Sequence, residues 1–157
     1  MNQEKVVGVI PALKSGFFGQ RSYTMIVTDQ RLILAELTNE LMKKEHQKNM
    51  RRSEEEGKGF LRKLKSSISS SFKFHHRYHD MDPVKILNEN PNNYEIRLSD
   101  IKSTKLRTGA YHPDSGKAPT HKMIIKWNGG KEKFTFERME PKQVQEILIQ
   151  VLGSKAR

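Results

Sequence analysis

The chain has 157 residues, of which 34% are hydrophobic and 30% are charged, and it contains no cysteine. This length suits one domain, and the lack of cysteine excludes a disulfide scaffold, a thiolate metal site and a cysteine nucleophile. The 29 Lys and Arg residues outnumber the 18 Asp and Glu residues, and the net charge of +11 favours anionic partners such as nucleic acid, anionic lipid or an acidic protein surface.

The sequence lacks the signals of membrane insertion and secretion. No apolar run approaches the roughly 18 residues that a membrane-spanning helix requires. The apolar stretch Val6–Leu13 is short and is interrupted by Gly8 and Pro11, so it does not resemble a signal peptide. We therefore expect a cytoplasmic protein whose membrane association, where it occurs, is peripheral.

Three strands are predicted near the N-terminus. Glu4–Ala12 is rich in Val and Ile, which favours a strand. Apolar and polar residues alternate over residues 22–28, which predicts a strand with one buried face. The short link Thr28–Arg31 leads into the nearly all-apolar segment Leu32–Leu37, so we expect the second and third strands to form a hairpin.

Residues 38–90 lack strand patterning and carry most of the excess charge. Positions 43–79 hold eleven basic and four acidic residues, a net charge of +7. A polar helix capped by Thr38 or Asn39 is predicted to run to Glu56, after which glycines interrupt it. We interpret residues 38–90 as a basic, largely helical insertion.

The second part of this insertion has an amphipathic pattern. Apolar residues from position 60 to position 72 recur at spacings of three and four, as on one face of a helix, although a run of serines weakens the helix propensity. Basic residues beside an apolar helix face favour binding to an anionic surface. The predicted electrostatic contacts are Lys58, Arg62, Lys63, Lys65, Lys73 and Arg77. The predicted apolar anchors are Phe60, Leu64, Ile68 and Phe72.

Strand patterning resumes after a short helix and a turn. Asp82-Pro83 predicts a helix start with proline at the first helical position, and residues 90–93 predict a turn. Asn128-Gly129-Gly130 is a strong hairpin signal, and the Pro- and Gly-containing residues 109–120 predict a loop. Further strands are predicted at residues 94–99, 102–108, 122–127 and 133–137.

The last predicted element is an amphipathic helix. Glu140-Pro141 favours its start, and Gly153 is typical of a helix end. Five apolar residues form one stripe at helical spacing, which predicts a face that covers a sheet or a partner. These residues are Val144, Ile147, Leu148, Val151 and Leu152.

Together these elements predict a mainly β (α+β) domain. Outside residues 38–90 there are about seven short antiparallel strands, which must form a sandwich or a partly open barrel, and the final helix can cover one open end. The predicted core residues are Tyr23, Val27, Leu34, Trp127, Phe134, Phe136, Ile147 and Leu148.

Two segments carry a family resemblance. Residues 23–33 read YTMIVTDQRLI, and residues 86–96 read ILNENPNNYEI and are followed by Ser99-Asp100-Ile101. These patterns resemble the first hairpin and the next strand, with its "SDI" start, of the pleckstrin-homology-like superfamily, specifically its bacterial PH and GRAM-like branches.

The resemblance implies both a fold and a class of function. It implies a partly open seven-stranded barrel closed by a helix, and a module that binds lipid headgroups, peptides or copies of itself. The phosphoinositide-reading pattern of eukaryotic members is absent from the first hairpin. The implied boundaries are a barrel at 1–37 and 91–137, a capping helix at 140–153 and an insertion at 38–90.

No motif indicates catalysis or a cofactor. The GxSxG, P-loop, GxGxxG and HExxH patterns are absent, so we expect a protein that is not an enzyme and has no cofactor. His75 and His79 have the i, i+4 spacing of a metal-binding pair. Because Lys73 and Arg77 would repel a cation, a solvated basic patch is the favoured interpretation, and we expect no metal site.

The favoured function is non-catalytic association with an anionic membrane through residues 58–77. Each base near an anionic leaflet contributes about 1 kcal/mol. The commoner arrangement for such a segment, with its apolar stripe packed on the barrel and its bases solvated, stays open. Nucleic-acid binding stays open as well, because the aromatic residues Phe72, Phe74 and Tyr78 are interleaved with basic residues. A third alternative is an acidic protein partner or self-association through edge strands.

Overall fold

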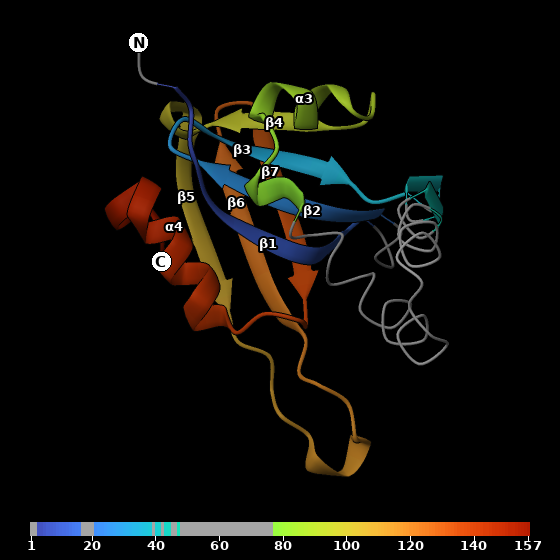
Figure 1. Ribbon diagram of the computed structural model, residues 1–157. Coiled ribbons are helices and arrows are strands. Elements are labelled where there is room, and N and C mark those ends of the chain that lie inside the picture. The colour runs from blue at the N-terminus through green and yellow to red at the C-terminus, as the bar shows by residue number, and fades with distance from the viewer. Residues whose placement is uncertain (1–2, 17–20, 39, 42, 45–46, 48–76) are drawn as a thin grey trace.

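The computed structural model describes residues 3–16, 21–38, 40–41, 43–44, 47 and 77–157 (Figure 1). These residues form a seven-stranded antiparallel sheet and a C-terminal helix, so the prediction of a mainly β domain is confirmed. The strands are β1 (Val6–Ser15), β2 (Arg21–Thr28), β3 (Arg31–Glu36), β4 (Tyr94–Arg97), β5 (Ile101–Arg107), β6 (His121–Trp127) and β7 (Gly130–Phe136). From residue 77 onward the helical segments are η2 (Arg77–His79), α3 (Pro83–Asn88), η3 (Leu98–Asp100), η4 (Pro113–Ser115), α4 (Pro141–Leu152) and η5 (Gly153–Lys155).

The sheet consists of two meanders. Its strand order is β4-β3-β2-β1-β7-β6-β5, so β4 and β5 are the edges of one open sheet. The meander β1–β4 meets the meander β5–β7 where β1 pairs with β7, with Lys14 opposite Thr135. Figure 1 shows the strands of the second meander running across those of the first. The sheet therefore folds over and encloses a core between its two halves.

The main core lies between the two meanders and α4. Leu13 of β1 and Phe134 of β7 are fully buried in it. The backbone N–H of Glu140 donates to Oε1 of Gln143 at the start of α4, and Gly153 ends the helix with a φ of +56°. The predicted apolar stripe of this helix is confirmed. Its fully or largely buried members are Val144, Leu148 and Leu152.

A second apolar cluster covers the opposite face of β1–β3. Ile26 is fully buried there, and Tyr78 of η2 and Ile86 of α3 belong to the same cluster. Residues Tyr23–Thr28 are consequently buried on both faces of β2, so the prediction of one buried face is wrong for this strand. The fully buried covering side chains, Tyr78 and Ile86, come from residues 77–88. Alternation within a strand cannot indicate that a remote segment covers its other face.

The short elements around α3 form as their capping residues predict. A carboxylate oxygen of Asp82 accepts a hydrogen bond from the backbone N–H of Val84 at 2.8 Å, and Pro83 occupies the first helical position. The side chain of Asn90 accepts from the backbone N–H of Asn92 at 2.9 Å. The predicted helix and turn are therefore both confirmed.

The start of the predicted polar helix is also observed. Residues 40–41 and 43–44 are helical, and Oγ1 of Thr38 accepts a hydrogen bond from the backbone N–H of Leu41 at 3.2 Å. This contact matches a capping role for Thr38. The rest of the predicted helix, to Glu56, lies mostly outside the described residues.

β1 continues past its predicted end at Ala12. The register with β2 shifts between Ile10 and Leu13, and Ala12 has a φ of +55°. A bulge of this kind takes up one extra residue and lets the pairing resume, so β1 reaches Ser15. The proline at position 11, which cannot donate a ladder hydrogen bond, lies in this irregular part of the strand.

Gly8 of β1 lies directly against α4, where a Cβ atom added to it would be 2.7 Å from Cγ2 of Ile147. We expect Gly8→Ala to lower the free energy of unfolding by about 1–3 kcal/mol, the usual effect of overpacking a core. Urea unfolding of Gly8→Ala, Ile147→Ala and the double variant measures this contact, because alanine at position 147 removes Cγ1, Cγ2 and Cδ1. The double variant should recover part of the loss, and strictly additive effects would contradict the proposed clash.

Candidate anion-binding surface

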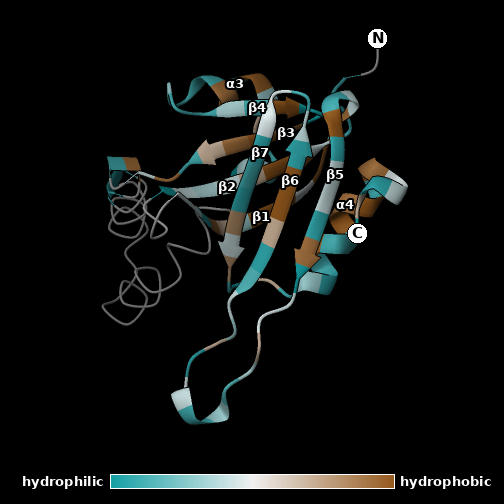
Figure 2. Ribbon diagram, turned by 180° about the vertical axis from the view of Figure 1, so that it is seen from behind, coloured by the Kyte–Doolittle hydropathy of each residue, from teal (hydrophilic) through white to brown (hydrophobic). Residues whose placement is uncertain are grey.

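The outer face of β6 carries cations at alternate positions. Met123 and Ile125 are fully buried, so Lys122, Ile124 and Lys126 project from the opposite side of the strand. Both lysines are exposed, whereas Ile124 is partly buried between them. In Figure 2 the three strands β5–β7 lie in front, with hydrophilic and hydrophobic bands along them.

The neighbouring strands place more cations on the same face. Residues paired across a sheet project from the same side, and the registers pair Arg107 with Lys122, Lys126 with Lys131, and Ile124 with both Lys105 and Lys133. β1 adds a cation at the junction of the meanders. We call this set the basic face. Its members, all exposed, are Lys14, Lys105, Arg107, Lys122, Lys126, Lys131 and Lys133.

The charges of the basic face are not balanced by neighbours. Within the described part of the chain, none of its seven members forms an ion pair. Two carboxylates on β7 and just after it are engaged elsewhere: Glu132 accepts a hydrogen bond from the hydroxyl of Ser15, and Glu137 accepts one from Thr120 at 2.8 Å. Seven cations beside these two carboxylates leave the face with a net positive charge toward solvent.

This arrangement opposes folding. Like charges directly opposite each other on neighbouring strands destabilise a sheet by roughly 0.2–1 kcal/mol per pair. Lys126 opposes Lys131, and Arg107 opposes Lys122. Because the core residues of these strands already fix their register, the cations are not needed for the fold, and they are suited to holding an anion.

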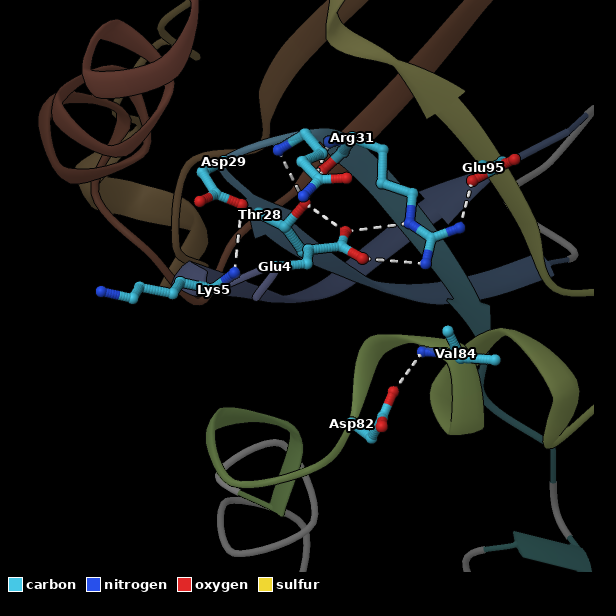
Figure 3. A network of polar contacts seen from close by, with 9 residues as sticks. Glu4, Lys5, Thr28, Asp29, Arg31, Asp82, Val84 and Glu95 are labelled. Atoms are coloured by element: carbon cyan, nitrogen blue, oxygen red, sulfur yellow. Dashed lines mark hydrogen bonds and ion pairs between the residues drawn. The ribbon is translucent and has the colours of Figure 1, made fainter. Parts of the chain in front are cut away.

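A second polar cluster, at Arg31, satisfies its own charges. The guanidinium of Arg31 donates to both carboxylate oxygens of Glu4 at 2.9 Å and to Glu95, as Figure 3 shows. The hydrogen bond to Glu4 is the main cause that raises the pKa of Arg31. Gln30 and Arg97 complete the lining of a hollow of about 390 Å³. This cluster ties the N-terminal segment to β3 and β4, and Arg31 is already paired with Glu4 and Glu95.

Arg77 is the one predicted site residue that the structure describes. Its guanidinium makes two hydrogen bonds to the carboxylate of Glu89, at 2.6 and 3.0 Å, and lies 5.2 Å from the ring centroid of Tyr78. These contacts hold η2 against α3. The remaining predictions fall outside the described residues. They are Lys58, Arg62, Lys63, Lys65 and Lys73 for electrostatic contacts, and Phe60, Leu64, Ile68 and Phe72 for apolar anchors.

The predicted histidine pair lies largely outside the described chain. His79 is described and His75 is not. Among the described residues, no group of three or more histidine and carboxylate side chains is placed to hold a metal ion.

Sequence reasoning missed the basic face because it counted charge along the chain. The charge excess outside positions 43–79 looked small, since the acids of other segments offset these lysines. A signal was nevertheless present, because Lys122 and Lys126 stand at an even spacing within a predicted strand. Lys133, at the start of the next predicted strand, and Lys131, just before it, are also evenly spaced. Even spacing places side chains on one face of a strand.

Comparison of the chain with protein-family models, curated proteins and solved structures gave no match. In the described residues, no helix has the length and apolar character needed to cross a bilayer.

Proposed function

We propose that this protein is a non-catalytic binding module that associates peripherally with an anionic membrane surface. The observation that carries the proposal is the basic face, seven exposed cations on β1 and β5–β7 without an ion pair among the described residues. The basic segment 58–77, predicted from the sequence, adds to the same attraction.

The strength of the attraction follows from the number of cations. Each base near an anionic leaflet contributes about 1 kcal/mol, so seven engaged together contribute about 7 kcal/mol. That free energy corresponds to a dissociation constant between about 1 mM and 1 μM. Binding of this strength is reversible and strongly dependent on ionic strength, because salt screens exposed charges over a Debye length of roughly 8 Å at 0.15 M.

The shape and composition of the basic face favour a bilayer over nucleic acid. Its cations spread over four adjacent strands, so they form a two-dimensional array that many lipid headgroups can meet at once. The positions between them are Ser103, Ile124 and Thr135, and the face offers no aromatic side chain for base stacking. Duplex nucleic acid, which needs only positive charge, is the second candidate.

The family assignment is part of the proposal. The strand order, with two meanders joined through β1 and β7 and a C-terminal helix over the core, supports a PH-like domain of the bacterial PH or GRAM-like type. Tyr78 and Ile86 pack in the second apolar cluster, on β1–β3, so residues 77–90 are part of the domain that contains the sheet. A basic insertion in this domain would therefore be shorter than residues 38–90.

Vesicle flotation tests the proposed function. The full chain should float with vesicles of phosphatidylcholine containing phosphatidylglycerol, should not float with phosphatidylcholine alone, and should be released by 0.5 M salt. Duplex DNA and duplex RNA at the same ionic strength provide the comparison. Binding to either duplex without flotation would replace the membrane with nucleic acid, and equal flotation with neutral vesicles would refute an electrostatic mechanism.

A further inference from the structure

One row of the basic face differs from the others in having a hydroxyl group at its centre. The registers align Lys14 of β1, Thr135 of β7, Lys122 of β6 and Arg107 of β5 across four adjacent strands. Neighbouring strands lie about 4.8 Å apart, so Lys14 and Lys122 flank Thr135 at about that distance on either side. Thr135 is partly buried, and its hydroxyl makes no hydrogen bond to another described residue.

From this row, and resting on the function proposed above, we infer a discrete site for a phosphate monoester. The hydroxyl of Thr135 is a donor at the floor of the site, and the long, flexible side chains of Lys14 and Lys122 can close over an anion from both sides. A phosphate monoester carries roughly −1.5 to −2 charges at pH 7 and three acceptor oxygens, which matches one hydroxyl and two ammonium groups.

The other two rows lack this combination. The middle row has the apolar Ile124 between Lys105 and Lys133. The third row has Lys126 between Ser103 and Lys131, so its centre is itself a cation. These rows attract anions through charge alone, whereas the Thr135 row adds a hydrogen-bond donor in a fixed position.

The site also spans the junction of the two meanders. Lys14 belongs to the first meander, and Thr135 and Lys122 belong to the second. An anion that contacts all three therefore ties the halves of the sheet together, and binding stabilises the folded chain. Glu137, two residues beyond Thr135, is the nearest opposing charge in sequence, and its carboxylate is held by Thr120.

Titration with inorganic phosphate, followed by amide chemical shifts and by the melting temperature, tests the inference. Potassium chloride at equal ionic strength serves as the reference. Phosphate should raise the melting temperature more than chloride, with shifts centred on residues 14, 122 and 135. Thr135→Val, which keeps the branched shape, and Lys14→Gln should each weaken binding by about fivefold. Glu137→Gln should strengthen it, and Lys131→Gln, on the same face, should change it less than twofold.

The source of the phosphate is distinguished with vesicles. Phosphatidic acid and phosphatidylglycerol are compared at equal surface charge. A preference for phosphatidic acid that Thr135→Val abolishes identifies a lipid headgroup. Phosphate binding without association to either vesicle identifies a free phosphomonoester and refutes the membrane function instead. Equal losses for Lys14→Gln and Lys131→Gln, or no phosphate effect beyond that of chloride, would overturn the site even where vesicle binding persists.

Discussion

Replacing Lys126 and Lys131 together with glutamine is expected to weaken binding to anionic vesicles by about 30-fold, because two bases of about 1 kcal/mol each are lost. The same change should stabilise the fold by roughly 0.2–1 kcal/mol, since the two lysines face each other directly across β6 and β7. Vesicle titration at low salt measures the first effect, and urea unfolding measures the second.

Matched lysines outside the basic face provide the control. Lys85 on α3 and Lys142 on α4 are exposed, so replacing both with glutamine removes the same net charge. We expect this control to reduce vesicle binding by much less than the Lys126 and Lys131 variant. Equal losses in the two variants would mean that net charge, and not the basic face, determines the association.

Replacing Tyr78 with alanine is expected to lower the free energy of unfolding by about 3–5 kcal/mol, the usual range for removing a large buried aromatic side chain. Tyr78 is 1% exposed and belongs to the cluster that covers β1–β3. Because the total stability of a domain is only about 5–15 kcal/mol, this loss would leave the protein marginal. Thermal and urea unfolding measure it.

Tyr111 supplies the control for this substitution. It is 71% exposed in the loop between β5 and β6, so Tyr111→Ala should change stability by about 0.5 kcal/mol or less. Ile86→Ala offers a second probe of the same cluster and should cost about 2–5 kcal/mol. If Tyr78→Ala and Ile86→Ala both cost less than about 1 kcal/mol, residues 77–88 do not fold as one unit with the sheet.

Local signals predicted most elements of the described fold. Asn128-Gly129-Gly130 set the hairpin between β6 and β7, and the apolar stripe of α4 indicated which side of that helix is buried. Such signals act between residues that are close in sequence, so they can be read without knowing the tertiary structure. The mainly β class followed from them.

Features that depend on remote contacts could not be read in the same way. The polar residues Thr24 and Thr28 of β2 suggested a solvated face, but both are fully buried in a strand that is covered on both sides. That covering requires Tyr78 and Ile86, which lie at least 50 positions further along the chain. Packing between residues so far apart in the sequence leaves no pattern within the strand itself.

The candidate site shows the same limit for charge. Each lysine pair on β6 and β7 can be seen in the sequence. The number of cations that β1, β5, β6 and β7 together place on one face depends on strand order and register. The sequence directed attention to the basic segment 58–77, where charge is dense along the chain. The fold gathers a comparable number of cations from four separate strands onto one face.

A spin label at the centre of the basic face tests the central claim most directly. The chain has no cysteine, so Ile124→Cys and Val84→Cys each introduce a unique attachment site, the first on the basic face and the second on α3. With anionic vesicles, we predict that a label at position 124 becomes shielded from a water-soluble relaxation agent, while a label at position 84 stays accessible. Shielding at position 84 with continued access at position 124 would contradict the account.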